Sequence, residues 1–187
     1  MEERAQSAVP DDVVARVRAG DARALESLFR AFYAPLCEFA VAYVHSPALA
    51  EELVQDIFAE VWTRRAAWTV HTGVRSYLFG ATRNRALNAR KRERVERDWQ
   101  DAVASGEPVA IHAYPPRPDE VLELAEAAGR VRAAVARLPE RCRLVMELRW
   151  QQGLSYAEIA DVMGISLKGV ENQLARGLKA LRGMLSA

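Results

Sequence analysis

A pair of short amphipathic helices separated by a glycine is predicted between Gly153 and Arg182, and no other part of the chain restricts its fold as strongly. The first helix is predicted from four apolar residues at the spacing of one helical face, Tyr156, Ile159, Ala160 and Met163. Ser155 and Glu158 have the separation of a capping box, which satisfies free N–H groups at a helix start. Gly164 predicts the helix end, because glycine readily takes the left-handed conformation of a C-cap.

The second predicted helix separates its apolar residues from its polar ones, and Ser166 is its expected N-cap. The apolar face is predicted to contain Leu167, Val170, Leu174, Leu178 and Leu181. The opposite face carries Lys168, Asn172, Gln173, Arg176 and Lys179. Two such helices form a helix-turn-helix whose second helix has the residue types that enter a DNA major groove. The alternative is an ordinary helix pair with a solvated polar face.

Composition limits the classes of protein to which the chain can belong. The chain has 187 residues, 50% hydrophobic and 27% charged, as expected for one soluble domain or two small ones. Its formal net charge of +1 means that attraction to nucleic acid has to come from local separation of charge. The sequence shows no signal peptide and no apolar run of about 18 residues, so a cytoplasmic location is predicted. Cys37 and Cys142 are expected to be buried free thiols in a reducing compartment.

Helical periodicity dominates the first hundred residues. Helices are predicted over residues 11–17, from Asp21 to Tyr43, from Pro47 to Trp68 and from Val74 to Asp98, with a loop at residues 69–73. Asp21 and Ser46 are expected N-caps, and Pro47 suits the first position of a helix. Pro35 predicts a kink or break near Ala34, because it lacks the N–H that an inner helical position needs.

A change of composition at Trp99 predicts two domains. Residues 99–118 contain Gly106 and several prolines but no helical period, so a flexible linker is expected there. Helices are predicted from Asp119 to the residue before Pro139 and from Pro139 to Gly153. The chain is therefore predicted to be all-α, with two small helical domains at residues 1–98 and 119–187.

The second half of the helix after Val74 is strongly basic. Its cations are Arg83, Arg85, Arg90, Lys91, Arg92, Arg94 and Arg97, and the aromatic residues near its start are Trp68, Tyr77 and Phe79. Cations bind phosphates and rings stack on unpaired bases, so this segment is a candidate contact for a nucleic-acid strand. Asn84 and Asn88, one turn apart, are candidates for contacts with base edges. The alternative is a solvated helix end whose aromatic residues belong to the core.

The helix after Pro47 has polar residues of the opposite character on one side, Glu51, Glu52, Gln55, Asp56 and Glu60. They form either a docking face for a basic partner or a set of acids that complement the helix dipole. A metal site is not expected, since no histidine accompanies Asp56 and Glu60. The sequence contains neither a catalytic triad pattern nor a glycine-rich phosphate loop. We therefore expect neither enzymatic activity nor a cofactor.

Three stretches carry a resemblance to a known family, namely AEELVQDIFAEVWTRR, VRSYLFGATRNRALNARKR and LPERCRLVMELRWQQGLSYAEIADVMGISLKGVENQLARGLKALR. In this order they are similar to bacterial RNA polymerase sigma factors of the sigma-70 family, extracytoplasmic-function (ECF) group. The resemblance implies a sigma region 2-like domain at residues 1–98 and a sigma region 4-like helix-turn-helix domain at 119–187. It also implies a transcription initiation factor that binds core RNA polymerase and directs it to particular promoters.

The resemblance further implies roles for three groups of residues. The clamp of the largest polymerase subunit would be bound by Glu52, Gln55, Asp56, Glu60 and Trp62. The melted minus-ten element would be read by Trp68, Tyr77, Arg83, Asn84, Arg85, Asn88, Arg90, Lys91 and Arg92. The duplex minus-thirty-five element would be read by Ser155, Ser166, Lys168, Gly169, Asn172, Gln173, Arg176 and Lys179. Other implied partners are the flap of the second polymerase subunit and an anti-sigma factor, often membrane-anchored; the free protein would be a monomer.

Three residues depart from the pattern of relatives. Gly169 and Gly177 stand where threonine and alanine are common, and Asn88 where aspartate is common, so DNA contacts there cannot be transferred from relatives. A mid-helix glycine costs about 1 kcal/mol relative to alanine. Two other functions are compatible with the residues. One is a dimeric helix-turn-helix regulator that binds operator DNA without polymerase, and the other is a nucleic-acid-processing enzyme with a metal at Asp56 and Glu60.

Overall fold

The computed structural model describes residues 12–101, 129 and 133–185, and the side chains of 95–101 are not part of that description. The chain divides into two compact units, Met1–Glu107 and Pro108–Ala187, which are described separately. Every regular element in the described residues is a helix, which confirms the predicted all-α class. None of these helices is long and apolar enough to cross a membrane.

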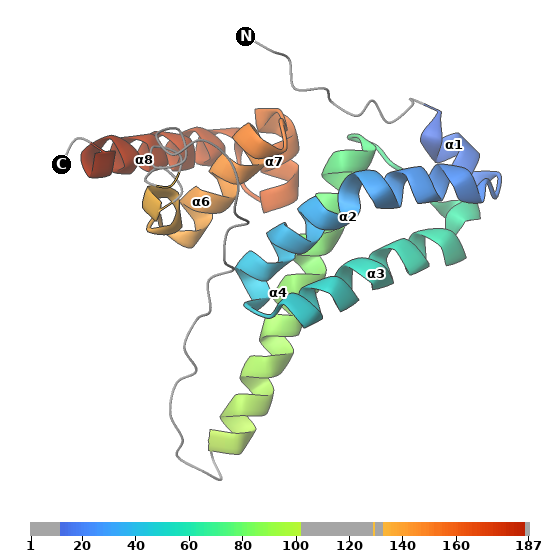
Figure 1. Cartoon of the computed structure of the whole chain (residues 1–187), viewed down its shortest axis with the longest axis horizontal. Helices are drawn as coiled ribbons and strands as arrows, with labels where there is room; N and C mark the ends of the chain where they lie inside the picture. The colour runs from blue at the N-terminus through green and yellow to red at the C-terminus, as the bar shows by residue number, and fades with distance from the viewer. Residues whose placement is uncertain (1–11, 102–128, 130–132, 186–187) are drawn as a thin grey trace. The chain divides into compact units, whose positions relative to one another are not determined.

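Four α-helices and a short 3₁₀ turn build the first unit. They are α1 (Val13–Arg18), α2 (Ala22–Val44), α3 (Pro47–Thr63), η1 (Arg65–Ala67) and α4 (Val74–Asp101). The long helix α2 packs against both α3 and α4, and α3 also packs against α4 (Figure 1). The side chains at the centre of this packing are apolar and almost fully buried, including Leu28, Leu36, Val54, Leu78 and Phe79. Helical spacing places them on the facing sides of the three helices.

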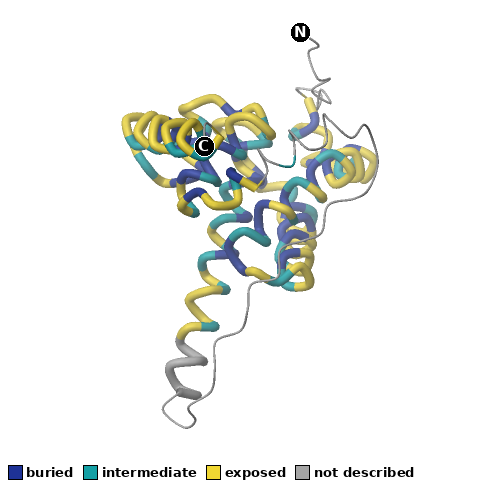
Figure 2. The backbone as a smooth tube through the Cα atoms, turned by 60° about the vertical axis from the view of Figure 1, so that its left-hand side comes forward, coloured by how far each residue is buried: buried dark blue, intermediate teal, exposed yellow. Residues whose placement is uncertain are grey.

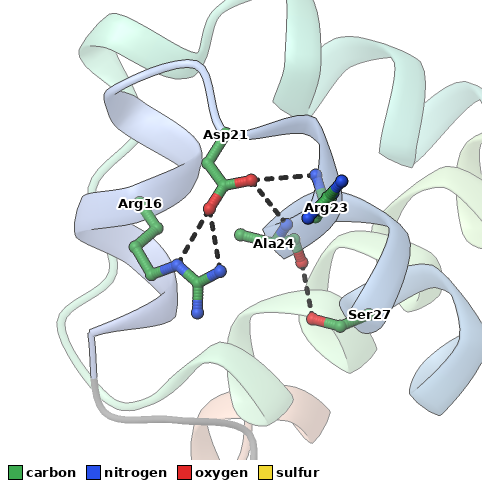
Figure 3. Close-up of polar contacts among 5 residues, drawn as sticks. All are labelled: Arg16, Asp21, Arg23, Ala24 and Ser27. Atoms are coloured by element: carbon green, nitrogen blue, oxygen red, sulfur yellow. Dashed lines mark hydrogen bonds and ion pairs between the residues drawn. The ribbon is translucent and has the colours of Figure 1, made fainter.

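Asp21 fixes the junction between α1 and α2 (Figure 3). Its Oδ1 accepts hydrogen bonds from the backbone N–H groups of Arg23, at 2.9 Å, and Ala24, at 3.3 Å, so it is the predicted N-cap of α2. Its Oδ2 accepts from Arg16 Nε at 2.9 Å and Nη2 at 2.8 Å. This hydrogen-bonded arginine lowers the pKa of the Asp21 carboxyl and raises that of Arg16. Ser27 donates to the Ala24 carbonyl in the next turn.

Helix α2 continues without a break through Pro35, where a kink or break was predicted near Ala34. A proline inside a helix costs about 3 kcal/mol or more, because one backbone hydrogen bond is lost and the ring crowds the preceding turn. Phe32, Leu36 and Phe39, within four residues of Pro35 on the same helix, are buried. Each contributes about 1.5–3 kcal/mol on burial, so together they outweigh that cost. Ser46 caps α3 as predicted, with its hydroxyl accepting from Leu49 N at 3.3 Å.

Helix α4 is longer than predicted. It extends to Asp101, three residues into the range predicted as linker, because Trp99, Gln100 and Asp101 include neither glycine nor proline to interrupt the helix. The rest of the predicted linker lies outside the described residues. Residues 119–128 of the helix predicted after Asp119 also lie outside the described residues, whereas residues 133–136 of that helix are helical.

The second unit contains α6 (Glu140–Met146), η2 (Glu147–Gln151), α7 (Tyr156–Met163) and α8 (Leu167–Leu185). The helix predicted from Pro139 to Gly153 is therefore α-helical only in its first half, because η2 is a π-helical turn. Gly153 follows with a φ of +67°, and Gly164 ends α7 with a φ of +59°. Both glycines adopt the left-handed conformation that other residues avoid.

The buried face of α8 is narrower than predicted. Val170, Leu174 and Gly177 are buried, whereas Leu167 is 54% exposed and Leu178 is 38% exposed. Gly177 lies against α6, and a methyl group at this position would overlap the thioether sulfur of Met146. The contact between α6 and α8 is therefore centred on Gly177, and Leu167 and Leu178 lie outside it. In α7 the buried residues are Ile159, Val162 and Met163, and the predicted core residue Tyr156 is 41% exposed.

The two cysteines are free thiols, as predicted. Cys142 is buried, but Cys37 is only half-buried, so the expectation of full burial is wrong for Cys37. Burial raises the pKa of both thiols. A raised pKa keeps a thiol protonated and unreactive at neutral pH.

Candidate nucleic-acid interface

Helix α3 presents a polar surface on the side away from its buried residues. The polar side chains Glu52, Gln55, Asp56 and Glu60 are all exposed, and we refer to them as the acidic face of α3. Gln55 donates from Nε2 to the Tyr33 hydroxyl at 3.3 Å. The ring of Trp62 is half-buried beside this face, and the Arg65 guanidinium lies 4.6 Å from its centroid. The residues predicted to bind polymerase are therefore brought together on one helix.

Arg85 of α4 forms ion pairs with this acidic face. Its Nη1 lies 3.3 Å from Asp56 Oδ2, and its Nη2 pairs with Glu60 Oε2. Glu60 also pairs with Arg64 through its other oxygen, at 3.1 Å. Arg85 is one of the predicted DNA contacts, and its pairing with these acids is not predicted by the sequence. Nothing local in the sequence signals this bridge, because the partners lie 25 and 29 residues apart on different helices.

Exposed polar and basic residues lie along α4 from Asn84 onward. Asn84, Asn88, Arg90, Lys91 and Arg92 are all exposed, and so is Arg94. Figure 1 shows this half of α4 extending beyond α2 and α3, and in Figure 2 its coloured part is a mixture of exposed and intermediate residues. The structure therefore brings these predicted minus-ten contacts together on one accessible segment. The side chain of Arg97 lies outside the description.

Trp68, which is predicted to contact the melted strand, is buried in the first unit. It is only 5% exposed, and its ring packs edge-on against Tyr77 with centroids 5.8 Å apart. Among the described residues, its Nε1 has no hydrogen-bond partner. Tyr77 is 36% exposed and remains a surface ring, whereas Phe79 is fully buried, as the alternative interpretation of the aromatic residues expected.

Arg83 is also partly incorporated into the fold. The residue is half-buried, and its Nε is buried without a hydrogen-bond partner in the part of the chain that the structure describes. An unpaired buried donor costs about 1–3 kcal/mol. The predicted minus-ten group therefore divides into an exposed set on α4 and three less exposed residues, the buried Trp68 and the half-buried Arg83 and Arg85.

Each helix of the helix-turn-helix begins with a local cap. Ser155 accepts from Glu158 N at 3.3 Å, and Glu158 Oε2 accepts from Ser155 N at 2.8 Å, which confirms the capping box. Ser166 Oγ accepts from Gly169 N at 3.1 Å at the start of α8. Both serines were predicted to contact DNA, and their hydroxyl groups have cap roles here.

Helix α8 exposes most of the predicted recognition residues. Lys168, Asn172, Arg176 and Lys179 are exposed, and Lys168 pairs with Glu171 at 2.8 Å. That hydrogen bond raises the pKa of Lys168. Gln173 differs from them, because it is half-buried and its Oε1 accepts from the Cys142 thiol at 3.0 Å. Gly169 is half-buried, and a methyl group there would lie 3.3 Å from Ile165 Cβ.

Two exposed aromatic residues that were not predicted to belong to a binding site, Trp150 and Tyr156, lie before and within α7. Trp150 is 54% exposed in the π-helical turn, and the Arg149 guanidinium lies 5.4 Å from the ring centroid of Tyr156. Arg149 also donates to the Leu154 carbonyl at 3.0 Å. π-Helical turns often occur near functional positions, a signal that the sequence does not reveal. Across the described residues there is no group of three His, Cys, Asp or Glu side chains that would hold a metal ion.

Comparisons with known proteins identify both units. The family model for Sigma-70 region 2 matches residues 28–96, and the model for Sigma-70, region 4 matches residues 128–181. The chain is 25% identical over 158 residues to the RNA polymerase sigma factor YlaC of Bacillus subtilis, covering 84% of this chain and 90% of that protein. It is 27% identical over 170 residues to the ECF RNA polymerase sigma factor RpoE of Cereibacter sphaeroides, covering 89% and 88%.

Two solved structures share the fold. The sigma factor RpoE of Bartonella quintana, crystallised with the anti-sigma factor NepR, matches with a TM-score of 0.62 and 22% identity, over 87% of this chain and 96% of that one. CnrH, in complex with the cytosolic domain of CnrY, matches with a TM-score of 0.59 and 20% identity, over 93% and 95%.

Proposed function

Because the chain belongs to the sigma-70 family of RNA polymerase sigma factors, ECF group, we propose that it recognises the two elements of a promoter by different means, one as a melted strand and one as duplex. Members of this family direct promoter-specific transcription initiation through RNA polymerase and are not themselves catalysts. The observation that carries the proposal is the contrast between a protruding polar and basic helix in the first unit and a capped helix-turn-helix in the second.

The acidic face of α3 binds core polymerase in this proposal. Four polar side chains point outward from one helix, and Trp62 adds an apolar ring at their edge. Acidic groups with an aromatic neighbour suit a basic partner surface that also offers apolar contact. The partner is the clamp of the largest polymerase subunit. The flap of the second subunit is the partner of the second unit.

The exposed half of α4 binds the minus-ten element as a single strand. Its arginines and lysine provide phosphate contacts, its two exposed asparagines provide contacts with base edges, and the Tyr77 ring is available for stacking. Trp68 supports Tyr77 from beneath and makes no direct contact. We place Arg83 in the same supporting role, because it is half-buried.

Helix α8 binds the minus-thirty-five element as duplex. Asn172, Arg176 and Lys179 are exposed and follow one another at helical spacing. An arginine or asparagine in the major groove discriminates between bases by about 1–3 kcal/mol when it makes two hydrogen bonds. Lys168 contributes charge at the start of the helix. Ser155 and Ser166 position the helix through their caps.

An anti-sigma factor is a further proposed partner. Both structural neighbours named above were solved in complex with another protein, and for RpoE of Bartonella quintana that protein is named an anti-sigma factor. A protein that binds the acidic face of α3 or the polar side of α8 would block the contacts proposed here. Such a partner would compete with core polymerase, and the free protein would be a monomer.

The test mixes the purified protein with core RNA polymerase and a library of promoter fragments. We expect a stable complex with core and selective initiation on a subset of fragments. Asp56→Arg should reduce association with core and leave binding of duplex DNA by the second unit intact, whereas Arg176→Ala should do the reverse. Absence of both core binding and start-site selection would reject the proposal. A symmetric dimer on duplex DNA without polymerase would support a conventional helix-turn-helix regulator instead.

A further inference from the structure

Arg85 connects the two candidate surfaces of the first unit. It belongs to the helix that carries the DNA candidates, yet its guanidinium is held by two carboxylates of the acidic face of α3. We propose that Arg85 is a phosphate-binding residue that the free protein keeps on this acidic face and releases to DNA when a cationic partner surface occupies the face. The identity of the partner as core polymerase rests on the proposed function, but the bridge itself does not.

The two carboxylates are more accessible than the arginine that they hold. The side chains of Asp56 and Glu60 are 60% and 44% exposed, whereas that of Arg85 is 31% exposed. An incoming cation therefore reaches the carboxylates from solvent without first displacing Arg85. Glu60 already accepts from a second cation, Arg64, at 3.1 Å, which shows that this site accommodates more than one positive group.

Exchange of cations at this site is energetically reasonable. Asp56 and Glu60 are one helical turn apart on α3, and two like charges at that spacing repel each other unless a cation lies between them. Arg85 provides this cation in the free protein, and a partner's lysine or arginine can replace it. Ion pairs at this level of exposure contribute little net stability, so replacing one cation by another costs little free energy.

A released Arg85 has the position and the chemistry to contact DNA. Asn88 and Arg92 follow it by three and seven residues on α4, which places all three on the same side of the helix, and both are exposed. The guanidinium fork binds a phosphate with the same paired geometry that it uses for a carboxylate. Freed from the acids, Arg85 would extend the exposed basic row by one cation toward the start of α4.

The test removes the two carboxylate charges by substitution, so that no partner protein is needed to release Arg85. The full-length variant Asp56→Asn/Glu60→Gln is compared with the wild type for binding of a fluorescent single-stranded oligonucleotide across a series of salt concentrations. Each phosphate contact on a single strand steepens the plot of log K against log salt by about 0.7. We expect this steepening in the variant, so that its advantage over the wild type grows about fivefold for each tenfold reduction in salt.

A matched control separates release of Arg85 from a general change of charge. Asp12→Asn/Glu38→Gln alters the net charge by the same amount at two exposed residues of the same unit that lie outside the bridge. This control should leave the salt slope unchanged. Adding Arg85→Gln should abolish the gain in the Asp56→Asn/Glu60→Gln background and change binding less than twofold in the wild type. Circular dichroism verifies the helical content of each variant.

Equal slopes in the wild type and Asp56→Asn/Glu60→Gln, or equal gains in that variant and the charge control, would overturn the proposal and leave Arg85 a purely structural residue. If the double variant loses helical content, Arg85→Lys replaces it. Lysine keeps the charge but lacks the fork that holds two carboxylates, so the slope should again steepen, and an unchanged slope would overturn the proposal. A protein that shows the steepening but ignores core polymerase would retain the bridge mechanism and reject the proposed partner.

Discussion

The two candidate DNA-binding helices differ in how far recognition is separated from folding. On α8 the fold uses Val170, Leu174 and Gly177, while the polar residues on the other side are exposed. On α4 and just before it, some candidate DNA contacts also make contacts that belong to the fold. Arg85 is held in an ion-pair bridge, and Trp68, next to the start of the helix, is part of the core.

This difference has a consequence for how each surface can be regulated. A helix whose recognition side takes no part in packing presents the same surface whatever else binds the domain. A surface whose cations are held by neighbouring helices depends on what those helices contact. We therefore expect binding by α8 to be constitutive, and binding by α4 to respond to partners at the acidic face of α3. The following predictions test this contrast, beginning with the largest effect.

Trp68→Ala should be the most destabilising change. Removal of a buried tryptophan leaves a cavity and costs about 3–5 kcal/mol, and Trp68 is only 5% exposed. The measurement is denaturant unfolding followed by circular dichroism. Trp68→Phe is the matched control, because it keeps a ring against Tyr77 and removes the unpartnered N–H. If Trp68→Ala weakens DNA binding without loss of stability, Trp68 is a direct contact and the contrast between the helices fails.

Arg176→Ala should weaken duplex binding without altering stability. The side chain is exposed on α8, so its loss should change the free energy of unfolding by no more than about 0.5 kcal/mol. A contact with guanine would cost about 1–3 kcal/mol of binding, or roughly 5- to 150-fold in affinity. Fluorescence anisotropy with minus-thirty-five duplexes measures this loss. An equal loss on all sequences would identify Arg176 as a phosphate contact and not a base contact.

Gly177→Ala should destabilise the second unit, because glycine at this position is needed for packing against α6. An added methyl group overlaps the Met146 thioether, and overpacking of this kind costs about 1–3 kcal/mol. In a Met146→Ala background the space is free, so the same change should stabilise the unit by about 1 kcal/mol through helix propensity. Chemical unfolding of the four proteins measures the cycle. A destabilisation of the same size in both backgrounds would rule out the Met146 contact as its cause.

The sequence predicted the features of this fold that are determined locally. The caps by Asp21, Ser46 and Ser155 and the left-handed Gly164 are present, because each depends on residues within one turn. A serine or aspartate before an apolar repeat is sufficient to predict where a helix begins. The resemblance to sigma factors depended on long ordered stretches and is confirmed by the family matches.

Features that depend on tertiary packing were predicted less well. The apolar stripe of α8 is wider than its contact with α6, and only the packing at Gly177 determines that Leu167 and Leu178 remain outside. The bridge from Arg85 joins helices that the sequence separates by 25 residues or more. Periodicity identifies an amphipathic helix but does not determine which part of its apolar side is buried.

The smallest expected effect concerns Asp21, which lies at the junction of α1 and α2, outside the two helices proposed to bind DNA. Asp21→Asn keeps an oxygen for the cap but loses the charge that pairs with Arg16. The Asp21 pKa is lowered, chiefly by the hydrogen bond from Arg16, so its contribution to stability is present above the ordinary carboxyl pKa of about 3.9 and is lost as the pH falls through the lowered value.

The wild type should therefore unfold at a slightly higher temperature than Asp21→Asn at pH 7, by roughly a few degrees. The difference should shrink as the pH falls through the lowered pKa of Asp21 and its carboxylate becomes protonated. Thermal unfolding at pH 7, 5, 3 and 2 measures this dependence, and an Arg16→Gln background is the control in which Asp21→Asn should have little effect. A difference that does not shrink as the pH falls would mean that the amide is a poorer cap, because only the ion pair depends on ionisation of Asp21. DNA binding at pH 7 should be unchanged, since a junction that serves only folding resembles the packed side of α8 and not the partner-dependent surface of α4.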